Sequence, residues 1–125
     1  MKSGQTLVFL LVFMAMAITV TTAAVLVIIS NSQAASKLEQ SLSAYAVAES
    51  GAEEALLSLL RKTTYASTGS EALTVGEGVA TITVAGTNPK TILSQGVYNN
   101  FFRQVQVTAG YSGGILSVTS WQEVY

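Results

Sequence analysis

One uninterrupted apolar stretch limits what this chain can fold into. Residues 7–29 contain no charged side chain, and threonine is their only polar residue type. A helix of this length would span roughly 35 Å, which is enough to cross a hydrocarbon core of ~30 Å with some tilt. The apolar core of a secretory signal peptide is shorter, about 7–15 residues. We therefore predict a retained membrane-spanning helix within residues 5–36, with the short N-terminal tail on the cytoplasmic side.

The composition argues against an enzyme or a nucleic-acid-binding protein. Only 10% of the 125 residues are charged and the net charge is -1, whereas soluble domains carry about 25% charged residues. A chain without a basic face is not expected to bind nucleic acid. Histidine, cysteine and aspartate are absent, and no glycine-rich phosphate loop precedes a helix. We therefore expect no catalytic residues, no metal and no cofactor.

The helical pattern continues beyond the apolar segment. No glycine or proline interrupts residues 6–50, and apolar residues recur at steps of three or four. We predict one helix from about Thr6 to Lys62, in which residues 37–62 are amphipathic and form the spine of a head. Residues 18–22 and Gly51 are its local weak points. The stripe expected to pack on the head consists of Leu38, Leu42, Tyr45, Ala52, Leu56 and Leu59.

Residues 63–125 have the alternating pattern of a sheet. Period-two runs predict strands at 78–84, 91–94, 102–108 and 115–121, and a shorter piece at 72–75 could add an edge. Turn residues occupy 87–90, 98–100 and 110–114. These short connections favour an antiparallel sheet of about four strands, joined to the helix by a loop at 63–72.

The head is too small to fold on the sheet alone. A domain of about 63 residues rarely gains more than ~3–5 kcal/mol from a single core. We therefore expect an α+β fold in which the amphipathic half of the helix packs on one face of the sheet. Arg103 either lies at the end of the sheet or reaches an acid, for which Glu49 is the candidate. Trp121 and Tyr125 are expected to cap the core, with a role as exposed contact residues as the alternative.

An apolar helix that continues into the spine of a small α+β head resembles the lollipop shape of type IV pilins and pseudopilins. The GQTL sequence of residues 4–7 looks like a prepilin leader junction. The resemblance implies that prepilin peptidase removes residues 1–4 by cutting after Gly4, and that Gln5 becomes the N-methylated N-terminus.

A second stretch strengthens the resemblance. Residues 44–56, AYAVAESGAEEAL, look like the A-x-x-A-A-E-A-G-x-E-x-A-L run of PilX-like minor pilins. Phe9 stands at the fifth mature position, where most major pilins carry glutamate. Several minor pilins also lack that glutamate, so the departure favours a minor subunit.

The resemblance implies a structural role in a filament of the cell envelope. The subunit would wait in the cytoplasmic membrane and then join other pilin subunits through a helix bundle, driven by an assembly ATPase and a platform protein. The filament would then lie outside that membrane, in the periplasm or beyond the cell. The assembly helix would include Leu7, Phe9, Leu10, Phe13, Ala17, Val20, Ala24 and Ile28.

A second interpretation remains open from the residues alone. Gly4 could precede an ordinary signal anchor that is never cut. The chain would then be a single-span membrane protein that presents a small β-rich binding module outside the cytoplasm.

Overall fold

The structure is a computed structural model that describes residues 2–66 and 69–125. The described residues form one helix and five strands. Contacts divide the chain into two units, with the boundary after Lys37. The predicted α+β class is confirmed, since helical residues of the second unit pack on an antiparallel sheet.

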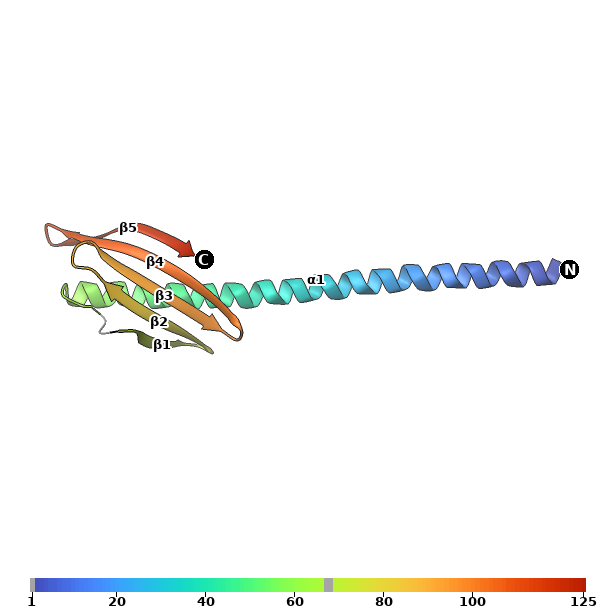
Figure 1. Cartoon of the computed structure of the whole chain (residues 1–125), viewed down its shortest axis with the longest axis horizontal. Coiled ribbons are helices and arrows are strands. Elements are labelled where there is room, and N and C mark those ends of the chain that lie inside the picture. Colours follow the sequence, from blue (N-terminus) through green and yellow to red (C-terminus); the bar gives the residue numbers. More distant parts are fainter. Residues whose placement is uncertain (1, 67–68) are drawn as a thin grey trace. The chain divides into compact units, whose positions relative to one another are not determined.

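The helix α1 runs from Lys2 to Arg61, close to the predicted bounds (Figure 1). The β-branched cluster at 18–22 does not interrupt it, and neither does Gly51. Arg61 lies in the last turn, where a cation interacts favourably with the negative end of the helix dipole.

The sheet is a five-stranded antiparallel meander in the order β1-β2-β3-β4-β5 (Figure 1). Its sequence-adjacent strands are therefore also its spatial neighbours, as the short connections predicted. The piece at 72–75 does form an edge strand, so the sheet has five strands where about four were expected. The strands are β1 (Glu71–Val75), β2 (Gly78–Ala85), β3 (Lys90–Tyr98), β4 (Phe101–Ser112) and β5 (Ile115–Val124).

The last turn is shorter than the sequence indicated. The turn signal covered residues 110–114, but β4 continues to Ser112, which pairs with Ile115. Only Gly113 and Gly114 make the turn, and both have positive φ, 60° and 81°. Glycine adopts such angles without a Cβ clash, so these two residues suffice to reverse the chain.

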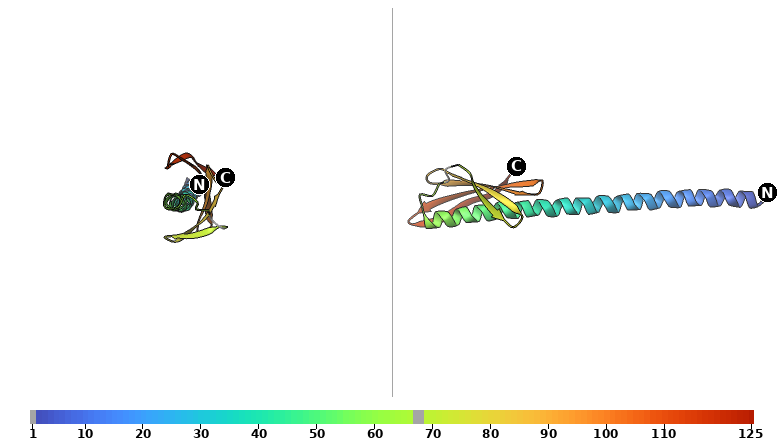
Figure 2. Two further views of the ribbon diagram at one scale, coloured as in Figure 1. Left: turned by 90° about the vertical axis from the view of Figure 1, so that its left-hand side faces the viewer. Right: turned by 90° about the horizontal axis from the view of Figure 1, so that it is seen from below.

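The core of the second unit lies between α1 and one face of the sheet. Figure 2 shows the strands curving around the helix on that side. Side chains of β2 and β3 alternate between the two faces of the sheet, so every second side chain of these strands packs against the helix. The buried core cluster consists of Ala48, Ala52, Ala55, Leu59, Ile82, Val84, Ile92, Val105 and Val107.

The predicted helix stripe is rotated relative to the face that the structure buries. Leu38 and Leu42 are 61% and 55% exposed, so their assignment to the core was wrong. Ala52 and Leu59 are buried, and Tyr45 and Leu56 are partly buried against the core. The remaining buried positions of the helix carry small or branched side chains: Ala44, Val47, Ala48, Gly51 and Ala55.

The close approach of helix and sheet explains this rotation. A Cβ built on Gly96 of β3 would lie 2.3 Å from the carbonyl oxygen of Ala44 and 2.3 Å from the backbone nitrogen of Ala48. Only small residues fit at such a contact, so the leucines turn away from it.

The expectation that Trp121 and Tyr125 cap the core was also wrong. Trp121 is 37% exposed and Tyr125 is fully exposed. Trp121 pairs with Val107 and therefore shares its side of the sheet. It lies on β5, however, an edge strand with no fully buried residue.

Candidate functional site

The apolar segment of α1 is the most conspicuous surface of the chain. Every described residue from 2 to 39 is exposed. The helix is long and apolar enough to cross a membrane. All the side chains proposed for assembly lie exposed along this one helix: Leu7, Phe9, Leu10, Phe13, Ala17, Val20, Ala24 and Ile28.

Three threonine side chains of this segment form hydrogen bonds to the backbone of their own helix. The Thr19 hydroxyl donates to the Met16 carbonyl at 2.8 Å, and the Thr21 hydroxyl donates to the Ala17 carbonyl at 2.7 Å. Thr22 donates in the same way to a carbonyl one turn earlier. Hydroxyls that are bonded to their own backbone are compatible with lipid or with an apolar neighbour. The threonine cluster therefore does not break the apolar surface.

The predicted processing junction lies in the first turns of the helix. Gly4 and Gln5 are both helical and exposed. A Cβ built on Gly4 would have no atom within 4 Å apart from its own local backbone. Packing within this chain therefore does not require glycine at this position.

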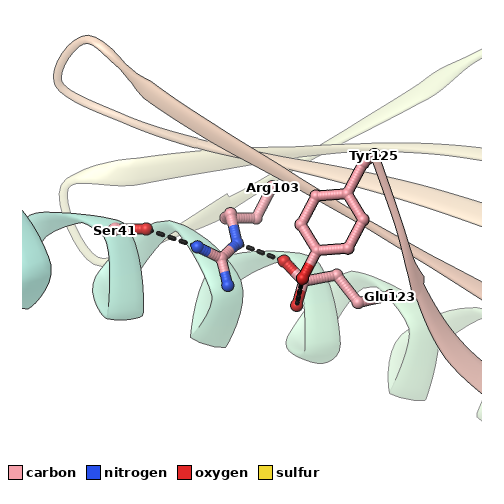
Figure 3. Close-up of polar contacts among 4 residues, drawn as sticks. All are labelled: Ser41, Arg103, Glu123 and Tyr125. Carbon is pink, nitrogen blue, oxygen red and sulfur yellow. Dashed lines mark hydrogen bonds and ion pairs between the residues drawn. The ribbon is translucent and has the colours of Figure 1, made fainter.

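A polar cluster around Arg103 joins the helix to two strands of the second unit (Figure 3). The Arg103 guanidinium forms an ion pair with Glu123 of β5 through Nε. Its Nη1 donates to the Ser41 hydroxyl of α1 at 2.6 Å. The Tyr125 hydroxyl donates to the other carboxylate oxygen of Glu123 at 3.4 Å. Arg103 also lies over the Tyr45 ring, with Cζ 5.9 Å from the ring centroid.

The structure gives Arg103 a different acid from the one expected. Glu49 was the predicted partner, but the ion pair is with Glu123. Val105 pairs with Glu123 across β4 and β5, and Arg103 lies two residues away on the same side of β4. The pairing could have been found only from the register of β5, which depends on a bulge near Thr108 and Ala109.

Neighbouring carboxylates raise the pKa values of two members of the cluster, Arg103 and Tyr45. Hydrogen bonding to Glu123 raises the pKa of Arg103, so its guanidinium stays charged. Hydrogen bonding to Glu49 and partial burial raise the pKa of Tyr45. The cluster fixes the start of the packed part of α1 against the end of the sheet. Of the two alternatives for Arg103, the structure shows the contact with an acid, although that acid is Glu123 and not Glu49.

The described residues contain no group of three or more side chains suited to bind a metal ion. Comparison of the chain with protein-family models, curated proteins and solved structures found no match.

Proposed function

We propose that the chain is a structural subunit, a minor pilin or pseudopilin, of a type IV pilus-like filament. Prepilin peptidase removes residues 1–4, Gln5 is N-methylated, and the apolar part of α1 enters a bundle of helices from other subunits. The protein resides in the cytoplasmic membrane before assembly, with its sheet outside the cytoplasm.

One observation carries this proposal. A single 60-residue helix is fully exposed and apolar over its first part, and it supplies the core of a small α+β unit with its last part. A soluble monomer rarely leaves so large an apolar surface uncovered. The segment therefore needs an apolar covering, which lipid would supply before assembly and protein neighbours afterwards.

The composition of the apolar segment fits such an exchange of neighbours. Lipid and neighbouring helices are about equally apolar, so the transfer gives little hydrophobic gain and close packing must stabilise the bundle. Small residues allow close approach of helices, and the segment contains Ala15, Ala17, Ala23 and Ala24. Extraction from the bilayer needs external work, which the proposed assembly ATPase would supply.

Processing gives a direct test. The chain is expressed with and without prepilin peptidase, and its intact mass is measured. We expect conversion to a chain that starts at Gln5 only when the enzyme is present. A Gly4→Leu variant should remain uncut although its helix still forms, because this position has no neighbours outside the local helix. Cleavage at another site, or no cleavage of the unaltered chain, would refute the proposed processing.

A second candidate is an unprocessed membrane protein whose sheet binds a partner. The sheet face directed away from the helix favours it, because Val79, Val97 and Phe102 pair across three strands and are 41%, 39% and 65% exposed. Such an apolar row can serve as a contact surface. This candidate predicts a full-length chain in the membrane fraction even when prepilin peptidase is present.

A further inference from the structure

A buried cation lies at the end of the sheet opposite to the Arg103 cluster. Lys90 is the first residue of β3 and is only 6% exposed. Within the described part of the chain it is the one charged side chain that is buried. Its position is not explained by the proposed assembly of the apolar helix.

The neighbours of Lys90 leave its charge uncompensated. Its Nζ donates to the carbonyl oxygens of Tyr65 and Gly86, at 3.0 and 3.4 Å. Both acceptors are neutral, and an ammonium group has a third proton to donate. No carboxylate of residues 2–66 and 69–125 forms an ion pair with it. Burial of a cation without an opposite charge is costly, so this arrangement favours an anion nearby.

A cavity adjoins this ammonium group. It has a volume of about 350 Å³ and is formed by the loop after α1 together with the turn between β2 and β3. Three of its residues carry hydroxyls, and none is acidic. The lining residues are Thr63, Thr64, Ala66, Gly86, Thr87 and Lys90, which we call the Lys90 pocket.

The walls of the Lys90 pocket are held in place. The Asn88 side chain donates to the Tyr111 carbonyl and accepts from the Tyr111 backbone N–H, both at 3.0 Å. These bonds fix the β2–β3 turn to β4. Gly86 has a φ of +88°, and a Cβ there would lie 2.8 Å from the Pro89 carbonyl oxygen. Glycine is therefore required where the backbone of the turn meets Lys90.

The charged residues around the pocket are of both signs, and among the described residues Lys90 is the one charged residue in its lining. Arg61 and Lys62 immediately precede the loop that forms one wall, and both are exposed. The first acid after that loop, Glu71, accepts a hydrogen bond from the Tyr65 hydroxyl. This carboxylate stays charged, and Glu54 also acts on Tyr65, but neither acid lines the pocket.

We propose that the Lys90 pocket binds a small oxyanion, either phosphate or a carboxylate group. The ammonium group of Lys90 supplies the charge and its third proton, and threonine hydroxyls supply further donors. Anion binding in this pocket does not require that the chain belongs to a filament, so it can be tested independently of the proposed function.

The test uses the full chain in detergent micelles and follows the backbone amide signals of Gly86 and Thr87 by NMR. Sodium phosphate and sodium acetate are titrated separately, with sodium chloride at equal ionic strength as the reference. We expect saturable shifts with phosphate or acetate and none with chloride. A saturable shift with phosphate only would identify a phosphate site, and a saturable shift with acetate would identify a site for a carboxylate group. Absence of a saturable shift with both anions would overturn the proposal.

Variants separate the pocket from general electrostatics. Lys90→Met should abolish the saturable shift, whereas Arg61→Gln removes an exposed cation outside the pocket lining and should preserve it. Because Lys90→Met also removes two bonds to backbone carbonyls, Thr87→Val serves as a milder variant that keeps Lys90. Loss of one hydrogen bond to a charged ligand should weaken binding about tenfold. Unchanged affinity in Thr87→Val, or retained shifts in Lys90→Met, would contradict the assignment.

Discussion

Gly51 of the helix lies directly against Ser94 of β3, so that a Cβ built at residue 51 would be 2.3 Å from Ser94 Oγ. The same Cβ would be 2.8 Å from the Cβ of Ala80. Among the described residues, the buried Ser94 hydroxyl has no hydrogen-bond partner. The glycine that looks like a weak point of the helix is therefore a requirement of its packing.

Gly51→Ala should destabilise the second unit although alanine is the better helix former. Alanine favours a helix by ~1 kcal/mol over glycine, but overpacking costs about 1–3 kcal/mol. Because Ala80 cannot move aside like a flexible side chain, we expect the clash to prevail. Thermal unfolding of the full chain in micelles measures the effect. A variant more stable than the unaltered protein would contradict this packing.

Ser94→Ala provides the matched variant. Removal of a buried hydroxyl that has no partner should be neutral or slightly stabilising. It also removes the atom closest to the new methyl group, so Gly51→Ala should cost less in the Ser94→Ala background. Equal costs in the two backgrounds would show that Ser94 does not contact residue 51.

Gly96→Ala should be more disruptive than Gly51→Ala. Its new methyl group would meet the backbone of the helix at Ala44 and Ala48, which no side-chain rotation can relieve. We expect a loss of about 3 kcal/mol, at the upper end of overpacking costs. Gly4→Ala is the control, since that position has open space around it. Equal unfolding midpoints for Gly96→Ala and Gly4→Ala would contradict the close approach of the helix and β3.

The elements of the fold were predictable from residue periodicity, whereas the packed face of the helix was not. The step of three or four residues marked the helix, and alternation marked the strands. The stripe prediction gave weight to large apolar residues such as Leu38 and Leu42. The contact with Gly96 instead selects Ala44 and Ala48, and a close approach between distant segments leaves no periodic signal of its own.

The partner of Arg103 was hidden for a related reason. Its parity with Val105 left open whether Arg103 lies at the sheet end or reaches an acid. The acid that it does reach, Glu123, depends on the register of β5. Sequence alone does not locate the bulge that sets this register. Lys90 was missed because a single lysine after a turn looks like an ordinary surface residue.

The Arg103 and Glu123 side chains should be energetically coupled. In a double-mutant cycle with Arg103→Met and Glu123→Gln, we expect a coupling of about 1 kcal/mol, since the pair is partly exposed. The same cycle with Glu49→Gln should give a smaller coupling, because Glu49 forms no ion pair with Arg103 and, among the described residues, the two share only Tyr45 as a neighbour. If Arg103 were coupled more strongly to Glu49 than to Glu123, the ion pair between Arg103 and Glu123 would be contradicted.

Tyr65 should make the stability of the second unit depend on alkaline pH. Partial burial and hydrogen bonding to Glu71 raise the pKa of Tyr65 from 10.0 to about 12. The folded state then keeps a proton that the unfolded state loses, so this contribution is complete below pH 10 and is lost as the pH rises to about 12. The excess stability of the unaltered protein over Tyr65→Phe should therefore shrink across this range. Chemical unfolding at several pH values measures it, and a difference that stays constant would exclude the effect.

The central claim is that the apolar helix is retained and exchanges lipid for protein neighbours. The most direct measurement is the intact mass of this chain in filaments sheared from cells. We predict a chain that starts at Gln5, is heavier by one methyl group and retains the whole apolar segment. A chain that lacks the residues through the mid-thirties, or one that is absent from filaments and stays full-length in the membrane, would contradict the account.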